Sequence, residues 1–90
     1  MSVAIDPPEL DYDSATPVYV QVADWIAGMI ASGEIAPGRP LPSEAQIMGG
    51  TGIARHTARK AVAVLRDRGL VVTTPGKGSY AAQSRDVGRP

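Results

Sequence analysis

The chain has 90 residues, enough for one small domain with a modest hydrophobic core. It has no Cys and one His (His56), which excludes disulfides and Cys- or His-cluster metal sites, and it lacks an apolar run of the roughly 20 residues that span a bilayer. The net charge is zero, but residues 1–45 carry seven acidic and one basic side chain whereas residues 46–90 carry two acidic and eight basic ones, so the second half suits a polyanion.

Both ends of the chain are predicted to lie outside the folded domain. Residues 1–15 are interpreted as a flexible acidic arm, in which Leu10 and Tyr12 are candidates for local docking. Residues 83–90 are predicted to be a disordered polar tail, whose Arg85 and Arg89 either add phosphate contacts or trail in solvent. The folded domain is therefore expected to span residues 16–82.

A first amphipathic helix is predicted to begin at Pro17 and to end at Ser32. Thr16 is the expected N-cap, Pro17 the first helical residue, and Gly33 the left-handed residue that terminates the helix. Apolar residues recur every three or four positions and form one face with Trp25 at its edge, namely Tyr19, Val22, Ile26, Met29 and Ile30.

A second, short helix is predicted after a turn-rich link that includes an extended piece near Arg39–Leu41. Ser43 is the expected N-cap of this helix, and Gln46 completes a capping box. Gly49-Gly50 weaken the end of the helix and are expected to begin a glycine break. Gly52 suits the positive φ of a helix-turn-helix turn.

A third, basic helix is predicted from about Ala54 to Arg68, where Gly69 stops it. Its expected buried stripe consists of Ala58, Ala61, Val62 and Leu65. Residues Leu70–Thr74 and Ser79–Ala82 are predicted strands, joined by a turn at residues 75–78. Helix, turn, basic helix and glycine-tipped hairpin describe a mainly α fold with a small β-hairpin, that is, a winged helix-turn-helix of three helices plus wing. A basic helix after a tight turn fits the major groove of duplex DNA.

Eight residues are candidate DNA contacts, namely Ser43, Arg55, His56, Thr57, Arg59, Lys60, Gly76 and Lys77. Residues at the start of the third helix reach base edges in helix-turn-helix proteins, and the Arg fork matches the O6 and N7 acceptors of guanine. The hairpin tip brings backbone and a positive charge to a sugar-phosphate chain, and Ser43 opens a helix N-terminus that suits phosphate. The alternative is a solvated amphipathic helix followed by an ordinary turn.

The serine, histidine and glycine residues that could take part in catalysis do not form a known catalytic or phosphate-binding motif. Ser43, Ser79 and His56 lack an activating third partner, and residues 49–52 follow a helix without the Lys-Ser/Thr of a phosphate-binding loop. Tyr19 and Trp25 are expected to pack in the core rather than to stack on single strands. We therefore expect that the chain is not an enzyme and that it has no cofactor and no metal site.

A set of residues occurs in the order and at the spacing of a known family. They are Pro17-Val18-Tyr19, Gln21-Val22-Ala23, Ile30, Gly33, Pro37-Gly38, Leu41-Pro42-Ser43-Glu44, residues 52–59, Ala61, Leu65, Gly69-Leu70-Val71 and residues 76–80. In this pattern the chain resembles the GntR family of bacterial transcription regulators, in its HutC- and YtrA-like branches. The resemblance implies a winged helix that binds operator DNA as a dimer. It also implies that Arg55, Thr57 and Arg59 read or clamp DNA, that Ser43 faces phosphate and that Gly76 enters the minor groove.

The chain departs from the family pattern at three places and in length. Ala45 stands where the family often has Arg or another polar residue, so one expected DNA contact is missing. Ala54 stands where Ser or Thr is usual, which removes a cap worth about 1 kcal/mol. Gly49-Gly50 replace residues that normally continue the second helix. Family members usually carry a C-terminal effector-binding, dimerising domain, so we expect either a stand-alone DNA-binding unit or part of a longer protein.

The sequence thus predicts a sequence-specific, double-stranded DNA-binding transcriptional regulator, a repressor without its own effector-binding domain. Two copies are expected on an inverted-repeat operator, in the cytoplasm and associated with the nucleoid, without membrane or small-molecule partners. One alternative is a winged-helix protein-interaction module with weak or lost DNA binding, which Ala45, Ala54 and the acidic first half favour. Another is the DNA-binding fragment of a pyridoxal-phosphate enzyme of the aminotransferase-linked GntR branch.

Overall fold

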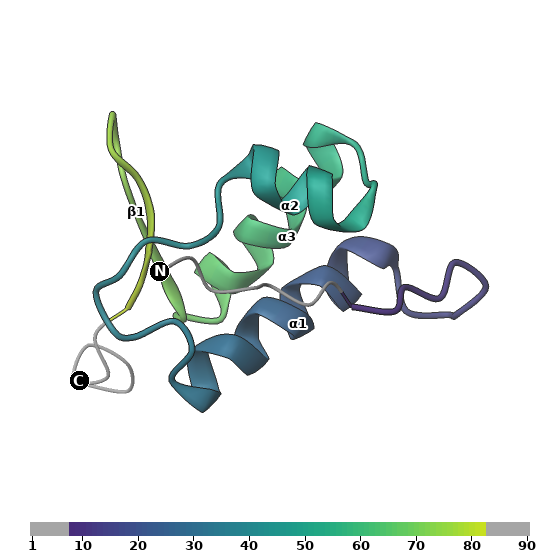
Figure 1. Cartoon of the computed structure of the whole chain (residues 1–90), viewed down its shortest axis with the longest axis horizontal. Coiled ribbons are helices and arrows are strands. Elements are labelled where there is room, and N and C mark those ends of the chain that lie inside the picture. The colour runs from purple at the N-terminus through teal and green to yellow at the C-terminus, as the bar shows by residue number, and fades with distance from the viewer. Residues whose placement is uncertain (1–7, 83–90) are drawn as a thin grey trace.

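The computed structural model describes residues 8–82 and contains three helices followed by a hairpin. The elements are α1 (Val18–Ser32), α2 (Glu44–Thr51), α3 (Arg55–Asp67), β1 (Val71–Thr74) and β2 (Gly78–Ala81). In Figure 1, α3 lies between α1 and α2, and the hairpin rises beside its C-terminal end. The predicted winged helix-turn-helix fold is confirmed. Residues 1–7 of the predicted arm and the predicted tail, 83–90, lie outside the described residues.

The hydrophobic core lies where α3 packs on α1, with α2 and the base of the wing closing it. Ala58, Ala61 and Leu65 are fully buried along α3, as their helical spacing predicts. Val62, which was predicted to belong to the same stripe, is only half-buried and lines a groove beside the wing. Within the described part of the chain, no helix is long and apolar enough to cross a membrane.

The start of α1 differs from the prediction by one residue. Pro17, not Thr16, occupies the N-cap position, with φ −56° and ψ 147°, and no side chain caps the helix. The carbonyl of Pro17 accepts from the amides of Val20 and Gln21, so the predicted Thr16 cap is wrong. The Gln21 amide group instead donates to the Thr16 carbonyl at 2.8 Å. The helix ends at Gly33, whose φ is 88°, as predicted.

The residues before α1 are attached to it through Gln21. The backbone amide of Asp11 donates to Gln21 Oε1 at 2.9 Å, and Gln21 Nε2 donates to the Asp11 carbonyl at 2.9 Å. Leu10 packs against the core, as expected, whereas docking of Tyr12 is wrong, because its side chain is 67% exposed. The flexibility assigned to residues 1–15 stays a prediction.

The capping box of α2 is confirmed, but the expected glycine break is not. The Gln46 amide donates to Ser43 Oγ at 3.1 Å, and the Ser43 amide donates to Gln46 Oε1 at 2.8 Å. The helix continues through both glycines to Thr51 and ends at Gly52, whose φ is 78°. Glycine costs helix propensity without forbidding the helix, and the fully buried Ile47 anchors α2 to the core.

The wing is an antiparallel hairpin with a third, short partner. Val71 pairs with Ala81 at its base, and Thr73 pairs with Ser79 nearer the tip. Pro40 forms an isolated bridge with Tyr80, and the Leu41 amide donates to the Ser79 carbonyl at 3.0 Å. The predicted extended piece near Arg39–Leu41 is therefore confirmed, and it fixes the link before α2 against β2.

The uncapped start of α3 generates a stability prediction. Ala54 has the extended N-cap geometry (φ −75°, ψ 159°) without a side-chain acceptor. Ala54→Ser supplies this acceptor, so we expect the free energy of unfolding to rise by about 1 kcal/mol, which raises Tm by about 4–8 °C in a domain of this size. Thermal and urea denaturation measure the change. The control Ala63→Ser, inside the same helix, should lower Tm slightly; equal shifts in both variants would contradict the capping argument.

Two glycines should respond to alanine with opposite signs. Gly28 lies inside α1 with open space around it, so Gly28→Ala should stabilise the fold by about 1 kcal/mol. Gly52 also has open space, but its positive φ strains any other residue, so Gly52→Ala should destabilise the fold by about 1–2 kcal/mol. Urea denaturation of the pair checks this expectation. Stabilisation by both substitutions would show that the turn tolerates a left-handed alanine.

Candidate nucleic-acid interface

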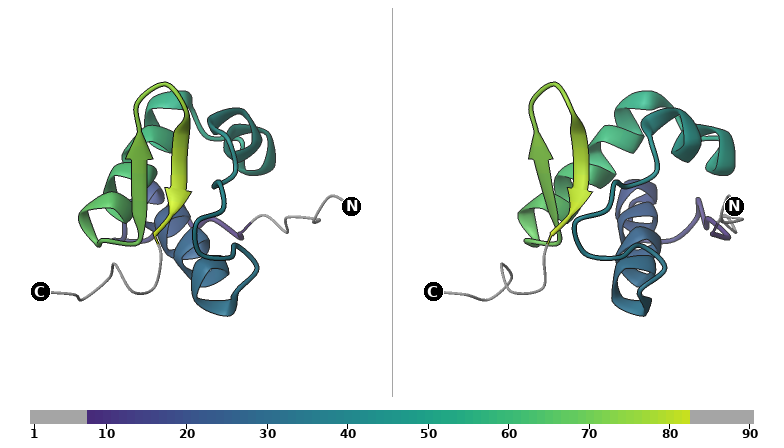
Figure 2. Two further views of the ribbon diagram at one scale, coloured as in Figure 1. Left: turned by 90° about the vertical axis from the view of Figure 1, so that its left-hand side faces the viewer. Right: turned by 60° about the vertical axis from the view of Figure 1, so that its left-hand side comes forward.

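A groove of about 780 Å³ lies between the start of α2, one side of α3 and the wing. Figure 2 shows the hairpin standing beside α3, with α2 at the other end of that helix. The groove brings together four of the predicted contact residues, Ser43, Arg55, Arg59 and Lys77. Three different elements therefore contribute to one concave, positively charged surface.

The basic side of α3 in the groove follows from helical spacing. Arg55, Arg59, Val62 and Arg66 are separated by four, three and four residues, so they lie on one side of the helix. The buried stripe of α3 lies beside this side and holds it at a fixed rotation toward the wing. Three guanidinium groups consequently project along the groove over three helical turns.

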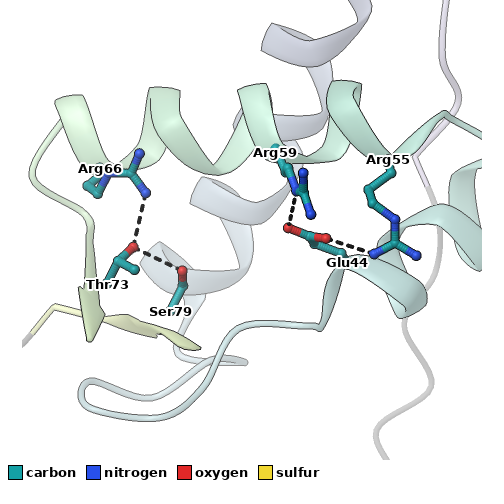
Figure 3. Close-up of polar contacts among 6 residues, drawn as sticks. All are labelled: Glu44, Arg55, Arg59, Arg66, Thr73 and Ser79. Carbon is teal, nitrogen blue, oxygen red and sulfur yellow. Dashed lines mark hydrogen bonds and ion pairs between the residues drawn. The ribbon is translucent and has the colours of Figure 1, made fainter. Parts of the chain in front are cut away.

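Glu44 joins two of these arginines. Its Oε1 lies 2.9 Å from Arg55 Nη1 and its Oε2 lies 3.0 Å from Arg59 Nε (Figure 3). The two arginine side chains are 55% and 64% exposed, so the pairs add little to stability. Their importance is geometric, because a guanidinium has five N–H donors. Each arginine is oriented by Glu44 and still has donors for a ligand in the groove.

The ionisation of Glu44 depends on these arginines. The hydrogen bond from Arg59 is the largest influence and lowers the pKa of the Glu44 carboxyl; burial opposes it, and the bond from Arg55 adds to the lowering. A lowered pKa means that the carboxylate is ionised at neutral pH and is lost only in acid. Sequence reasoning did not select Glu44, although it directly follows the capping Ser43 at the start of α2.

The other four predicted residues lie elsewhere on the domain surface. Lys60 Nζ lies 4.4 Å from the centroid of the Tyr19 ring, so the lysine side chain lies over α1. His56 is exposed and Thr57 half-buried, and neither lines the groove. Gly76 is exposed at the hairpin tip next to Lys77. Their roles as DNA contacts stay predictions.

Three residues that the sequence analysis did not select as DNA contacts, namely Arg66, Thr73 and Ser79, also line the groove. Arg66 Nη1 donates to Thr73 Oγ1 at 3.0 Å, and Thr73 Oγ1 lies 3.1 Å from Ser79 Oγ (Figure 3). The available signal was the spacing of Arg66, which is three helical turns from Arg55 on the same side of the helix.

The arginine at the C-cap of α3, Arg68, belongs to a different surface. Arg68 Nη1 lies 2.8 Å from Asp24 Oδ1 and links the end of α3 to α1. Four basic side chains therefore line the groove against the single carboxylate of Glu44, namely Arg55, Arg59, Arg66 and Lys77. Within residues 8–82, no three acidic, His or Cys residues are grouped so that they could hold a metal ion. The groove thus has the charge of an anion-binding surface.

Comparisons with known proteins agree with this geometry. The family model for the gntR family of bacterial regulatory proteins matches residues 18–80. The transcriptional repressor NagR of Bacillus subtilis (strain 168) is 32% identical over 76 residues, which cover 84% of this chain and 31% of NagR. The chain thus spans about a third of the length of the curated relatives it matches.

Solved structures show the same fold. YtrA from Sulfolobus acidocaldarius, a GntR-family transcription factor, superimposes with a TM-score of 0.72 at 38% identity, covering 86% of this chain and 65% of that one. The DNA-binding domain of AraR, solved in complex with the operator ORX1, gives a TM-score of 0.74 at 32% identity over 84% of this chain and 98% of that domain. With its three helices, its wing and the family match over most of its length, this chain belongs to the gntR family of bacterial regulatory proteins.

Proposed function

We propose that this chain is the double-stranded DNA-binding domain of a sequence-specific transcriptional regulator, and that α3 is its recognition helix. The observation that carries the proposal is the pair Arg55 and Arg59, which one carboxylate orients in the groove between α2, α3 and the wing. Both arginines lie in the first turns of α3, the part of a recognition helix that reaches base edges. Their forks suit guanine, with about 1–3 kcal/mol of discrimination for a good bidentate contact.

The residues around this pair are proposed to hold the DNA backbone. Lys77 and Gly76 at the hairpin tip contact a sugar-phosphate chain, and Ser43 presents the N-terminus of α2 to a phosphate. His56, Thr57 and Lys60 are proposed as further contacts of α3 outside the groove. Phosphate contacts fix orientation, whereas the two arginines carry the sequence information.

The relatives support this proposal, but they do not decide between repression and activation of transcription. AraR's DNA-binding domain is solved on operator DNA, and NagR is named a repressor, whereas another relative is named the glc operon transcriptional activator. We propose repression, by two copies on an inverted repeat, without catalysis and without an effector site in these 90 residues. A protein that acts on operator DNA works at the nucleoid in the cytoplasm.

A second candidate function is a winged-helix protein-interaction module. Glu44 favours it, because its carboxylate already partners both arginines. Ala45 in the first turn of α2 and Ala54 at the N-cap of α3 favour it too, because neither has a polar side chain that could contact DNA. The salt dependence of duplex binding separates the candidates. Phosphate contacts release counterions and give a steep negative slope of log K against log salt, which a protein partner does not require.

The proposal is tested by selection from a randomised duplex pool at near-physiological salt. The native chain should enrich an inverted repeat, and the Arg55→Ala/Arg59→Ala variant should lose that enrichment, because both base-reading forks are removed. Arg68→Ala is the matched control, since Arg68 is the C-cap of the same helix but pairs with Asp24 outside the groove. Absence of enrichment, or enrichment that survives the double substitution, contradicts sequence reading by α3. Enrichment of a single half-site bound by one copy contradicts the dimer.

Glu44→Gln should raise affinity for DNA in general while lowering sequence discrimination. The substitution removes a negative charge from the groove and releases two guanidinium groups from their fixed orientation, but Ser43 and Gln46 still form the capping box. We expect the ratio of dissociation constants for scrambled and selected duplexes to fall by about threefold to tenfold, which is part of the roughly 1–3 kcal/mol that a good bidentate contact contributes. Fluorescence anisotropy with both duplexes at one salt concentration measures the ratio.

Glu34→Gln is the charge-matched control for this experiment. Glu34 follows α1 and is exposed, and it does not line the groove. It should change neither constant by more than the general charge effect, so the ratio stays at the native value. An unchanged ratio in Glu44→Gln, or equal changes in both variants, contradicts an orienting role for Glu44.

A further inference from the structure

Arg66 connects α3 to both strands of the wing. Its Nη1 donates to Thr73 Oγ1 on β1 at 3.0 Å, and this hydroxyl lies 3.1 Å from Ser79 Oγ on β2 (Figure 3). Thr73 and Ser79 are paired directly across the hairpin. One guanidinium on the helix is therefore linked to a hydroxyl on each strand, directly to Thr73 and through Thr73 to Ser79.

This link lies above the buried base of the hairpin, where it can restrain the position of the tip. Val71 and Ala81 form the base of the wing and are buried in the core. Thr73 and Ser79 lie two residues nearer the tip, and they are on the same face as Val71 and Ala81 because side chains alternate along a strand. The side chain of Thr73 is exposed and that of Ser79 is half-buried. A two-stranded hairpin has little stability of its own. Contacts above the buried base consequently decide how the tip is held.

Lys77 is the residue that such a link would control. It is the last residue of the turn, directly before the first residue of β2, and it lines the groove together with Arg66 and Thr73. A rotation of the hairpin about its base would move Lys77 further than it moves Thr73, because the tip is farther from the base. A link between Arg66 and Thr73 that restrains this rotation would therefore set the distance between the lysine and a ligand in the groove.

We propose that Arg66 is a positioning residue for DNA binding, which holds the wing through Thr73 and Ser79 so that Lys77 faces the groove. This inference rests on the proposed function and adds that a residue of α3 determines how much the wing contributes to affinity. Arg66 has further N–H donors, so direct contact with a phosphate is the competing explanation. The two explanations differ in whether removal of the Thr73 hydroxyl has the same effect as removal of the guanidinium.

Double-mutant cycles on the selected operator test this proposal. Lys77→Ala should weaken binding by the native chain by about threefold to tenfold, as expected for loss of a phosphate contact. In the Arg66→Met and Thr73→Val backgrounds, the same substitution should weaken binding by less than about twofold, because coupled residues are not additive. Thr73→Val is the decisive background, since it retains the charge of Arg66 and valine suits a strand.

Three controls distinguish positioning of the wing by Arg66 from direct contact of Arg66 with DNA and from unfolding of the variants. Arg68→Met removes an arginine that links α3 to α1, and Lys77→Ala should retain its full effect in that background. Ser79→Ala should reduce the effect of Lys77→Ala in the same direction as Thr73→Val. Thermal denaturation establishes that each variant is folded at the assay temperature.

Several results would overturn the role of Arg66. Equal loss from Lys77→Ala in all backgrounds means that Arg66 does not position the wing, whatever its effect on Tm. Weaker binding by Arg66→Met with native binding and native Lys77 dependence in Thr73→Val means direct phosphate contact. If Lys77→Ala does not weaken binding by the native chain, then Lys77 makes no contact with DNA that Arg66 could position. If operator binding still requires Arg55 and Arg59, each result overturns only the inference on Arg66 and leaves the proposed function standing.

Discussion

The architecture depends on the narrow buried stripe of α3. Ala58, Ala61 and Leu65 are fully buried against α1, α2 and the wing base, and two of them are alanines that let neighbouring elements approach closely. Because the stripe is narrow, most of the circumference of α3 remains available for other contacts. Because it is fully buried, the helix cannot rotate without exposing Leu65 or burying charge. The direction of each basic side chain of α3 follows from this one constraint.

The fixed rotation of α3 gives its basic residues different roles. Arg55 and Arg59 project toward the start of α2, where Glu44 receives both, and Arg66 projects toward Thr73 of the wing. Lys60 lies over Tyr19 on the α1 side. A sequence with zero net charge thus presents a positive groove, because the acidic side chains within residues 8–82, apart from Glu44, lie outside it. The local distribution of charge decides what such a surface attracts.

Much of the fold could be predicted because its signals are local. The Ser43 capping box, the positive φ of Gly52 and the spacing of Leu65 each depend on residues within one or two turns. The glycine break predicted at Gly49-Gly50 was wrong, because the burial of Ile47 in the core outweighs the low helix propensity of glycine. Glu44 and Arg66 act through partners that periodicity cannot identify, since Glu44 meets Arg55 and Arg59 across the turn between two helices. Sequence periodicity therefore located the basic helix and its arginines but not Glu44, the residue that orients Arg55 and Arg59.

Backbone amide chemical-shift mapping of the labelled chain during titration with the selected duplex tests the role of the groove most directly. Shifts concentrated at the start of α2, along the Arg55–Arg66 side of α3 and at the hairpin tip, and weakened by added salt, are the predicted result. Saturable binding with shifts confined to α1 and the outer face of the wing would contradict the assignment of the groove as the DNA-binding surface.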